Sequence, residues 1–482
     1  QAYPRAEIRV EEMASTTPGQ VDIRYHVVED DEVSFGQILI QGNFKTDDWV
    51  IRDELGFRPG EPLSLLRAEI GQQNLRSSGL FNTVQVAFLD LEDGNEDAVN
   101  VVVQVEERHD YRLALEAALG VSSDRGLVAE AGMVSPNILG QGLRGELRGE
   151  YATELSSTDE FFLAVEGKLI LPRWITRRLT GRAVSPRLET TAFWRQEPTE
   201  RFGELTSYGF GLAVSKLGRF GLFKDWLLSV RYDLRQRNRD EQLNRVADPS
   251  EDIEQAKVRT RTGAIGPVLI IDKRRDDDGR PNPLAPTRGF KLEARMLVAH
   301  RYLAGQDNFI KIGLGGQHFW KPRSRLVISN GLRYDQGLFP FGGVALPEVE
   351  RFFAGGDTTV RGFEEDRLAV EELLTESYPG VTRLEILPAG GNLRFIHNLD
   401  VQIEVGQMRG IPVASAVFLD TGLVTNSLDG FQITELRHSL GVALIRWVTP
   451  FSSLSLEWAI PLDPRTGDNP RGRYHLNLGL LF

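Results

Sequence analysis

Cysteine is absent from the sequence, so no disulfide can hold the fold and no thiol can act as a nucleophile. No run of about 18 apolar residues occurs either, which excludes a transmembrane helix. The seven histidines are scattered, and the sequence contains neither a G-x-S-x-G elbow nor an H-E-x-x-H pair. We therefore predict that the protein is not an enzyme and that it holds no metal and no cofactor.

Basic residues are fewer than acidic ones. The 56 lysines and arginines face 68 aspartates and glutamates, and the net charge of −12 argues against a nucleic-acid partner. The chain of 482 residues instead has 48 glycines and 25 phenylalanines, a composition that fits many strands joined by tight turns. Membrane-crossing strands alternate apolar and polar residues, so the missing apolar runs do not exclude a membrane barrel.

Residues 1–30 predict a single hairpin. Ala6 to Val10 and Val21 to Val28 alternate like strands, and Thr17-Pro18-Gly19 supplies a turn. The apolar positions Val21, Ile23, Tyr25 and Val27 return at one constant offset as Val99, Val101, Val103 and Val105, and Ile8 returns as Val86. A constant offset with matching periodicity indicates two copies of one module. Residues 1–30 are then the C-terminal part of a truncated copy.

Residues 31–109 predict a complete copy that begins with a strand and two helices. Val33 to Ile40 alternates as a strand. Thr46 is the expected N-cap of a first helix that runs to Leu55. Ser64 is the expected N-cap of a second helix that runs through Ser77.

The second half of this module predicts two strands. Leu66, Ile70 and Leu75 should share one face of the second helix and cover a sheet. Val84 to Leu91 and Val99 to Glu106 then follow as strands. The order strand, helix, helix, strand, strand is that of an α/β domain.

From Tyr111 onward, longer segments alternate between an apolar and a charged face. In one of them Leu143, Leu147 and Tyr151 lie opposite Arg144, Glu146, Arg148 and Glu150, and four charges on one face exclude a packed sandwich core. The same pattern occurs in Leu228 to Leu234, Phe290 to Val298, Leu399 to Val405 and Leu454 to Ile460. One face is predicted to contact lipid and the other a wet lumen, in strands of about 9–11 residues. At roughly 20 to 24 residues per strand and turn, residues 110–482 accommodate a barrel of about sixteen strands.

A glycine-rich loop, Glu350 to Asp366, lies between two of these segments. It resembles the long loop of the outer-membrane β-barrel assembly factor superfamily (BamA, TamA and their relatives), in which V-R-G-F folds back into the barrel. The matching residues are Val360, Arg361, Gly362 and Phe363. Further segments resemble turns of that family in the same order, namely Pro136 to Gly142, Pro286 to Gly289, Gly390 to Asn392 and Thr449-Pro450. Residues 31–109 resemble its POTRA domain, so the resemblance implies a mainly β protein with a transmembrane barrel after α/β POTRA domains.

The resemblance also implies partners for the loop arginine. Phe418, Asp420 and Gly422 match the family's F-x-D-x-G strand, whose Phe and Asp face the lumen. The family's inward glutamate falls on Asp400, a shorter carboxylate, and Glu404 on the same face could substitute for it. Because arginine keeps its charge and can bind a carboxylate through two bonds, Arg361 is expected to pair with Asp420 and Asp400 and fix the loop inside the barrel.

The C-terminal segment alternates in the manner of a membrane strand. Tyr474, Leu476, Leu478, Leu480 and Phe482 are predicted to point outward, with a terminal aromatic at the membrane interface. Asn477, Gly479 and Phe482 resemble the C-terminal β-signal of outer-membrane proteins. That signal indicates a barrel but not what the barrel does.

The resemblance implies an assembly factor that folds and inserts client β-barrel proteins into the outer membrane of a Gram-negative-type cell, with POTRA domains in the periplasm. An organelle outer membrane is the less expected location. A client segment would add to an open POTRA sheet edge. The first barrel strand, Tyr111 to Leu119, would meet the last, Tyr474 to Phe482, at a seam that templates a nascent strand. The expected partners are unfolded clients, the lipid bilayer, and accessory lipoproteins or an inner-membrane partner.

Other functions remain open at this point. An exporter of the two-partner secretion type resembles this family in barrel and loop, but it passes an unfolded client through the lumen. A passive porin is a third class, against which the POTRA-like module argues. The POTRA-like module could also be a spacer whose edge is blocked. Within the assembly factors, BamA-like and TamA-like proteins are not separated.

Overall fold

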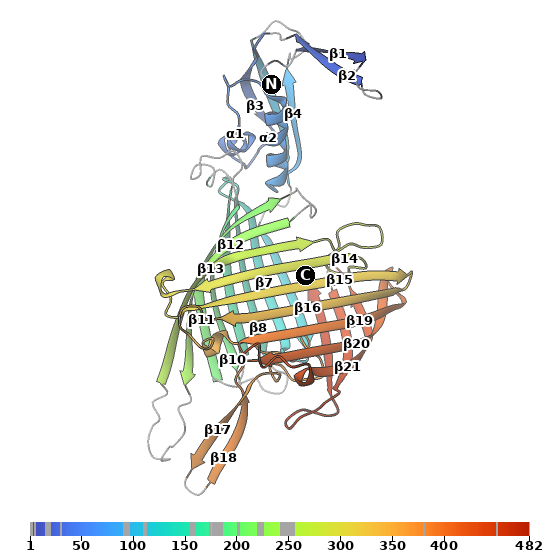
Figure 1. Cartoon of the computed structure of the whole chain (residues 1–482). Helices are drawn as coiled ribbons and strands as arrows, with labels where there is room; N and C mark the ends of the chain where they lie inside the picture. Colours follow the sequence, from blue (N-terminus) through green and yellow to red (C-terminus); the bar gives the residue numbers. More distant parts are fainter. Residues whose placement is uncertain are drawn as a thin grey trace. The chain divides into compact units, whose positions relative to one another are not determined.

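The computed structural model describes residues 3, 6–14, 21–28, 31–89, 97–108, 113–153, 161–172, 175, 187–199, 203–218, 226–241, 256–378, 381–449 and 452–481. The helices and strands follow the order labelled in Figure 1. Within the described ranges, no helix is both long enough and apolar enough to cross a membrane.

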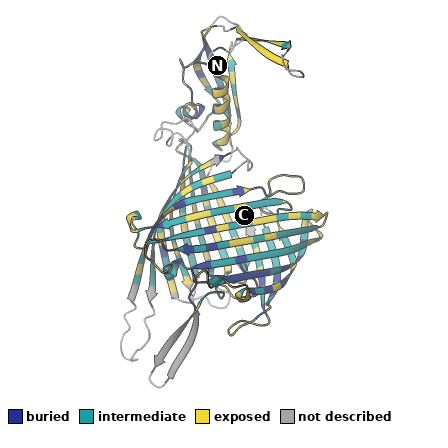
Figure 2. Cartoon of the chain, viewed as in Figure 1, coloured by how far each residue is buried: buried dark blue, intermediate teal, exposed yellow. Residues whose placement is uncertain are grey.

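The N-terminal hairpin is formed by β1 (Glu7–Ala14) and β2 (Val21–Val28), which pair antiparallel. Both strands are exposed and are drawn largely in yellow in Figure 2. Val10 pairs with Tyr25, whereas Val86 pairs with Val103 in the module that follows. If the two hairpins are matched through Tyr25 and Val103, Val86 corresponds to Val10, so the expected equivalence of Ile8 with Val86 is wrong by two residues. The connection between the paired strands is two residues longer in the second hairpin, and connection length sets register.

The complete module is a three-stranded sheet with two helices. β3 (Ser34–Gln41) pairs in parallel with β5 (Ala98–Glu107), and β4 (Phe81–Leu89) pairs antiparallel with the other side of β5. α1 (Asp48–Leu55) and α2 (Leu65–Ser77) connect β3 to β4. Side chains from all five elements form one apolar core, which includes Phe35, Ile51, Leu75, Val84, Val99, Val101, Val103 and Val105.

The first helix starts later than predicted. α1 has Asp47 as its N-cap, without a side-chain cap hydrogen bond. Thr46 is buried, and its backbone N–H donates to Glu107 Oε1 at 2.7 Å. The Thr46 hydroxyl accepts a hydrogen bond from Asn137 Nδ2 at 3.0 Å, so it does not cap the helix. The predicted end at Leu55 is confirmed, and Gly56 follows it in the left-handed conformation with φ 74°.

The second helix has the predicted bounds but buries another face. Ser64 caps it by accepting a hydrogen bond from the Arg67 N–H at 3.3 Å, as expected. The buried residues are Ala68, Gly71 and Leu75, whereas Leu66 and Ile70 are about half exposed. A Cβ on Gly71 would lie 2.4 Å from the Leu55 carbonyl oxygen. The two helices therefore meet through small residues, which turns the larger side chains outward.

The remainder of the chain forms a closed antiparallel barrel of sixteen strands (Figure 1). Its first eight strands are β6 (Ala114–Ser122), β7 (Gly126–Ile138), β8 (Leu143–Thr153), β9 (Phe161–Leu171), β10 (Arg187–Thr199), β11 (Gly203–Gly218), β12 (Trp226–Glu241) and β13 (Ala256–Asp272). The other eight are β14 (Gly289–Ala299), β15 (Phe309–Arg323), β16 (Leu326–Leu338), β19 (Leu393–Met408), β20 (Ile411–Thr425), β21 (Arg437–Val448), β22 (Ser452–Pro461) and β23 (Arg473–Leu481). β23 pairs with β6 and closes the barrel.

Strand length varies more than the predicted 9–11 residues. β23 has 9 residues, but β13 has 17. β12 and β13 stay paired from Trp226↔Ile271 to Glu241↔Ala256. A hairpin can continue past the hydrocarbon core because its ladder satisfies the backbone on both sides of the membrane boundary. The estimate from membrane thickness therefore gave a lower bound for the longer strands.

The predicted alternation of the barrel strands is present. Leu147 and Tyr151 of β8 are exposed on one face. On the other face, β8 forms ion pairs of Arg144 with Glu146, Arg148 with Glu116, and Glu150 with Arg125. Figure 2 shows the resulting bands of differently exposed residues along the strands. The lumen is therefore lined by paired charges.

The segment after β16, residues 339–370, is called the lumen loop below. It contains the short 3-10 turn η2 (Glu348–Glu350), and the hairpin β17 (Glu371–Tyr378) with β18 (Val381–Pro388) follows it. Two isolated bridges, Phe352↔Gly391 and Ala354↔Leu368, tie the loop to itself and to the start of β19. The loop places Val360 and Phe363 in an apolar cluster with Ile396 of the barrel wall.

Candidate functional site in the barrel lumen

Arg361 lies at the centre of the contacts between the lumen loop and the barrel. Its Nε and Nη2 donate to the two carboxylate oxygens of Asp420 at 2.8 Å each, and its backbone N–H adds a bond of 3.1 Å to Asp420 Oδ2. Nη2 also donates to Asp400 Oδ2 at 3.2 Å. The Arg361 side chain is 9% exposed and that of Asp420 is 0% exposed. The two carboxylates expected from the sequence therefore both bind the buried arginine.

A third carboxylate, which the sequence reasoning missed, completes the coordination of the guanidinium. Arg361 Nη1 donates to Glu457 Oε2 at 2.8 Å, from β22. Glu404, the suggested substitute for the family glutamate, lies near a bulge of β19 and accepts a bond from Gln407 instead. Glu457 lies between the outward positions Leu456 and Trp458, so the alternation of its strand placed it on the lumen face. That signal could have identified it.

A second arginine binds the same carboxylates from the wall. Arg446 of β21 donates through Nη1 to Asp400 Oδ1 and through Nε to Glu457 Oε1, both at 2.7 Å. Three carboxylates thus face two arginines. For Arg361, burial alone would lower the pKa, but the hydrogen bond and charge of Asp420 outweigh burial and raise it. Arg361 therefore stays charged. Its carboxylate partners fix it through directional hydrogen bonds as well as through their opposite charge.

Phe418 and glycine residues shape the surface under the arginine. The Arg361 guanidinium carbon lies 3.4 Å from the centre of the buried Phe418 ring, a cation–π contact. A Cβ on Gly422 would lie 2.5 Å from Val360 Cγ2, so only glycine admits that side chain. Gly362 has φ 98° and passes close to the backbone of β22. The residues of V-R-G-F and F-x-D-x-G thus lie together in the structure.

The start of the loop has its own ionic anchor. Glu350 is buried and pairs with Arg237 of β12 and with Lys311 of β15, the latter at 3.0 Å. Burial opposes ionisation of Glu350, but the charges of Lys311 and Arg237 outweigh it and lower its pKa to about 2. The loop is therefore held at two places by opposite arrangements, a cation of the loop at Arg361 and an anion of the loop at Glu350.

The C-terminal strand contacts the loop through its lumen face. Asn477 Nδ2 donates to Asp357 Oδ2 at 3.2 Å, and the neighbouring inward residue His475 is buried. Tyr474, Leu476 and Leu478 are exposed on the opposite face, as the alternation predicts. Gly479 faces Ser453 of β22. Phe482 lies outside the described residues, as does Tyr111 at the other side of the seam.

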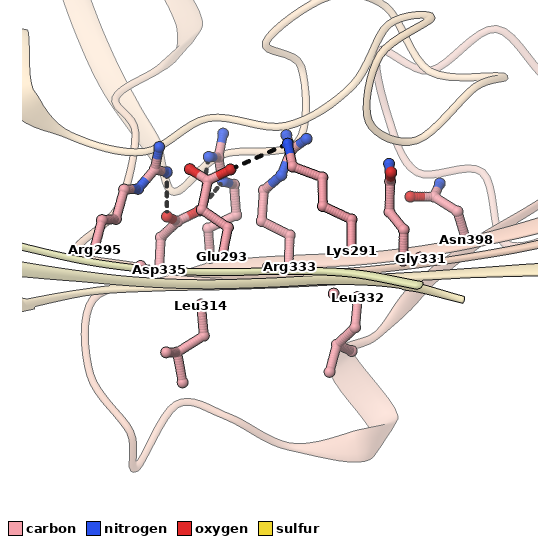
Figure 3. A pocket seen from close by; sticks show the side chains of 14 residues that line it. Lys291, Glu293, Arg295, Leu314, Gly331, Leu332, Arg333, Asp335 and Asn398 are labelled. Carbon is pink, nitrogen blue, oxygen red and sulfur yellow. Dashed lines mark hydrogen bonds and ion pairs between the residues drawn. The ribbon is translucent and has the colours of Figure 1, made fainter. Parts of the chain in front are cut away.

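A hollow of about 350 Å³ lies in the lumen wall formed by β14, β15, β16 and β19 (Figure 3). Asp335 accepts from Arg295 Nη2 at 2.7 Å and from Arg394 Nη2 at 2.7 Å. Leu314 and Leu332 lie on the other side of the same sheet. A Cβ on Gly313 would lie 2.3 Å from Arg295 Nε, so glycine leaves room for the ion pairs to lie flat.

These features define a class of protein, a transmembrane β-barrel with an α/β module before it and a returning loop held by buried ion pairs in its lumen. The Omp85 superfamily domain matches residues 137–482, and a POTRA domain, described as a surface antigen variable number repeat, matches residues 33–108. The chain belongs to the Omp85 superfamily.

Two of the curated relatives are proteins named outer membrane protein assembly factor BamA. The protein from Neisseria meningitidis is 24% identical, in an alignment covering 100% of this chain and 60% of the relative. The protein from Nitratidesulfovibrio vulgaris is 21% identical, with 100% and 55% covered. The chain thus spans about 60% or less of the length of these relatives.

Solved structures show the same fold. BamA from Haemophilus ducreyi lacking POTRA domains 1–3 aligns with a TM-score of 0.70 and 17% identity, covering 100% of this chain and 90% of that one. CdiB from Acinetobacter baumannii aligns with a TM-score of 0.58 and 12% identity, covering 100% and 79%. The barrel and the POTRA region are therefore an architecture shared by proteins with different names.

Proposed function

We propose that the chain is the barrel and adjoining POTRA region of an assembly factor that folds client β-barrel proteins and inserts them into the outer membrane. The curated relatives named as assembly factors support this class. The barrel would lie in the outer membrane of a Gram-negative-type cell, with the POTRA region on the periplasmic side. The proposed partners are unfolded clients and lipid, with accessory lipoproteins or an inner-membrane protein. The proposed activity requires no catalytic residue.

The observation that carries the proposal is the short ladder between the first and last strands. β23 pairs with β6 only from Asn477↔Ser122 to Leu481↔Ala118 within the described residues. β12 and β13 pair over nearly the full length of both strands. Gly479 faces Gly120 in the middle of the short ladder, so this pair of residues adds no side-chain contact across the strands. Fewer bonds make this seam easier to open than an interior pair.

The proposed mechanism uses the seam as a template. A nascent client strand would pair with the backbone groups that an open β6 or β23 presents, because unpaired strand edges attract other strands. In the POTRA region, residues 60–63 already bond to the first half of β3 through Phe35 N–H to Glu61 O and Leu63 N–H to Val33 O, both at 2.8 Å. The proposed client contact in this domain is therefore the second half of β3, residues 38–41.

The experiment is a reversible lock on the seam. Val121 and Leu478 are direct partners across β6 and β23, and the chain has no native cysteine. Val121→Cys with Leu478→Cys should form a disulfide that stops client insertion, and reductant should restore it. The matched control is Leu456→Cys with Leu476→Cys, which locks the neighbouring pair of β22 and β23. That lock should leave insertion unchanged, because those strands need not separate.

The same experiment tests the second candidate, an exporter of the two-partner secretion type. CdiB shares the fold of this chain, so the fold alone does not separate the two candidates. An exporter passes its client through the lumen and does not need an open seam. A seam-locked protein that works at the normal rate would reject the assembly mechanism and favour transport through the lumen.

A further inference from the structure

The ladder between β6 and β23 ends before the side-chain contacts across the seam do. The last backbone bond runs from the Ser123 N–H to the Leu476 carbonyl, at 3.0 Å. Continued in the same register, the next facing residues on the lumen side are Asp124 and His475. Their closest atoms, Asp124 Oδ1 and His475 Nδ1, lie 3.5 Å apart. A side-chain pair therefore extends the seam beyond its backbone ladder.

The pair is buried, although it lies beside a polar lumen. The exposed fraction is 1% for the His475 side chain and 6% for that of Asp124. Burial opposes ionisation of Asp124, but the approach of His475 and the hydrogen bond from the Asp357 backbone outweigh burial and hold the pKa of Asp124 below the usual range. Asp124 is thus a carboxylate whose position depends on groups across the seam and in the loop.

The lumen loop covers the pair and bonds to both members. The Asp357 backbone N–H donates to Asp124 Oδ2 at 2.8 Å, on the β6 side. The Gly362 backbone N–H reaches His475 Nε2 at 3.5 Å, on the β23 side. Asn477 of β23 donates to Asp357 Oδ2 at 3.2 Å. The segment from Asp357 to Gly362 therefore straddles the line along which the barrel closes.

These contacts assign one tautomer to the histidine. Nε2 faces a backbone N–H and must accept, so the ring hydrogen belongs on Nδ1, which faces Asp124. The loop thus bonds to the turn after the first strand through the Asp357 N–H and to the last strand through the Gly362 N–H and Asn477, while His475 Nδ1 approaches Asp124 without completing a hydrogen bond. Gly356 permits the approach, because it has φ 80° and a Cβ there would lie 3.0 Å from Asp124 Oδ2.

We propose that Asp124, His475 and Asn477, with the loop segment Asp357 to Gly362, form a clasp that keeps the first and last barrel strands together. In this clasp Asp124 and His475 are positioning residues, and the seam separates only after the loop segment leaves them. The inference rests on the proposed function, because seam opening matters only to a protein that works through its seam. It gives the lumen loop a role distinct from the anchoring by Arg361, since Arg361 bonds to β19, β20 and β22 and, among the described residues, not to β6 or β23.

Hydrogen exchange of the full chain in detergent micelles tests the clasp without a client. Asp124→Ala should speed exchange of the β6 and β23 amides by about tenfold, the change expected for the loss of one buried hydrogen bond. Exchange in β15, which is remote from the seam in the strand order, should not change. Asp124→Asn should restore much of the protection, because its side-chain oxygen can still accept from the Asp357 N–H.

Two further variants separate the clasp from general instability. Asp233→Ala removes another lumen carboxylate, which pairs with Arg231 within β12 at 2.7 Å, and it should leave the seam amides protected. Asp357→Ala removes the bond from Asn477 but keeps the backbone bond to Asp124, so it should raise seam exchange less than Asp124→Ala. If Asp124→Ala does not fold, seam exchange in Asp357→Ala tests the clasp instead. Unchanged seam exchange in the folded variants, or an equal rise in β15, overturns the clasp.

A client-insertion assay on the same variants distinguishes this inference from the proposed function. Faster seam exchange together with altered insertion supports both. Faster seam exchange with unaltered insertion supports the clasp and counts against insertion through the seam.

Discussion

The POTRA domain and the barrel have interiors of opposite composition. The POTRA core is apolar, with Phe35, Leu63 and Val103 all nearly inaccessible to water. The lumen around Arg361 holds three carboxylates and two arginines. In the first interior, stability is spread over many small gains from burying apolar surface. In the second, a few charges must offset one another's desolvation, so a single missing partner leaves others uncompensated.

From this difference between the two interiors, we expect the largest effect of a single substitution at Arg361 in the lumen. Arg361→Ala takes away the arginine from Asp420, which is 0% exposed and keeps only the bond from the Asn398 amide among its described side-chain contacts, whereas Asp400 and Glu457 keep Arg446. Breaking a buried ion pair in this way costs about 3–5 kcal/mol, here in docking of the loop. We expect a folded barrel, a protease-sensitive loop and impaired activity. Gel mobility of the heated and unheated protein, and limited proteolysis, measure the first two.

Arg361→Lys is the control for this prediction. It keeps the charge but cannot form the paired bonds to Asp420, so it should lie between wild type and Arg361→Ala. Full activity and unchanged protease protection in Arg361→Ala would show that the loop does not depend on this anchor.

A smaller effect is expected in the POTRA core. Leu63→Ala removes a side chain that is 0% exposed and should destabilise this domain by about 3 kcal/mol. Hydrogen exchange of residues 31–89 in the full chain should rise, while the heat-dependent mobility of the barrel stays the same. The control Leu66→Ala, at a half-exposed position of α2, should change exchange little. A Leu63→Ala barrel that loses its folded mobility would contradict the independence of the two interiors.

The smallest effect is a pH dependence of the loop. Burial, followed by the charges of Asp366, Asp124 and Asp357, raises the pKa of Glu365 to about 7. A raised carboxyl pKa means that the docked loop prefers the protonated acid. Docking should therefore strengthen as pH falls from about 7 towards the usual value of 4.5, and above 7 it should stay at its weakest level, because the carboxyl is then ionised in both the docked and the undocked loop. The effect should be small, because Glu365 is exposed to water and its charge is screened.

Proteolysis of the loop at pH 8 and pH 5.5 measures this dependence. Glu365→Gln should remove most of it and protect the loop at pH 8. A loop that becomes more protease-sensitive on acidification would have the opposite sign and exclude Glu365 as the titrating group.

The sequence predicted features that are repeated or local. Alternation over many segments indicated the barrel, since every strand carries the same pattern, and Ser64 was identified because an N-cap involves only neighbouring residues. The predicted buried face of α2 was wrong because large apolar residues were given more weight than Ala68 and Gly71, whose small size lets the helices approach. Which face of α2 is buried depends on its packing against α1, and the local pattern of α2 contains no information about α1.

In the lumen, the family resemblance pointed to Asp420 and Asp400 but not to Glu457 or Arg446. Alternation shows which strand residues face the lumen, yet it does not show which inward residues from different strands lie at the same height. That depends on register, and the pairings of β20 with β21 and of β21 with β22 each contain a register shift. The clasp residues depend on register in the same way.

The partners of Arg361 also set the order in which the molecule can fold. They follow it in the chain by 39, 59 and 96 residues, at Asp400, Asp420 and Glu457. The entropy of closing such separations delays these contacts, and each carboxylate is in place only when its own strand, β19, β20 or β22, has formed. The three contacts are therefore complete only once β22, the strand before the last, is in place. A fully docked loop marks a chain whose strands have formed at least as far as β22.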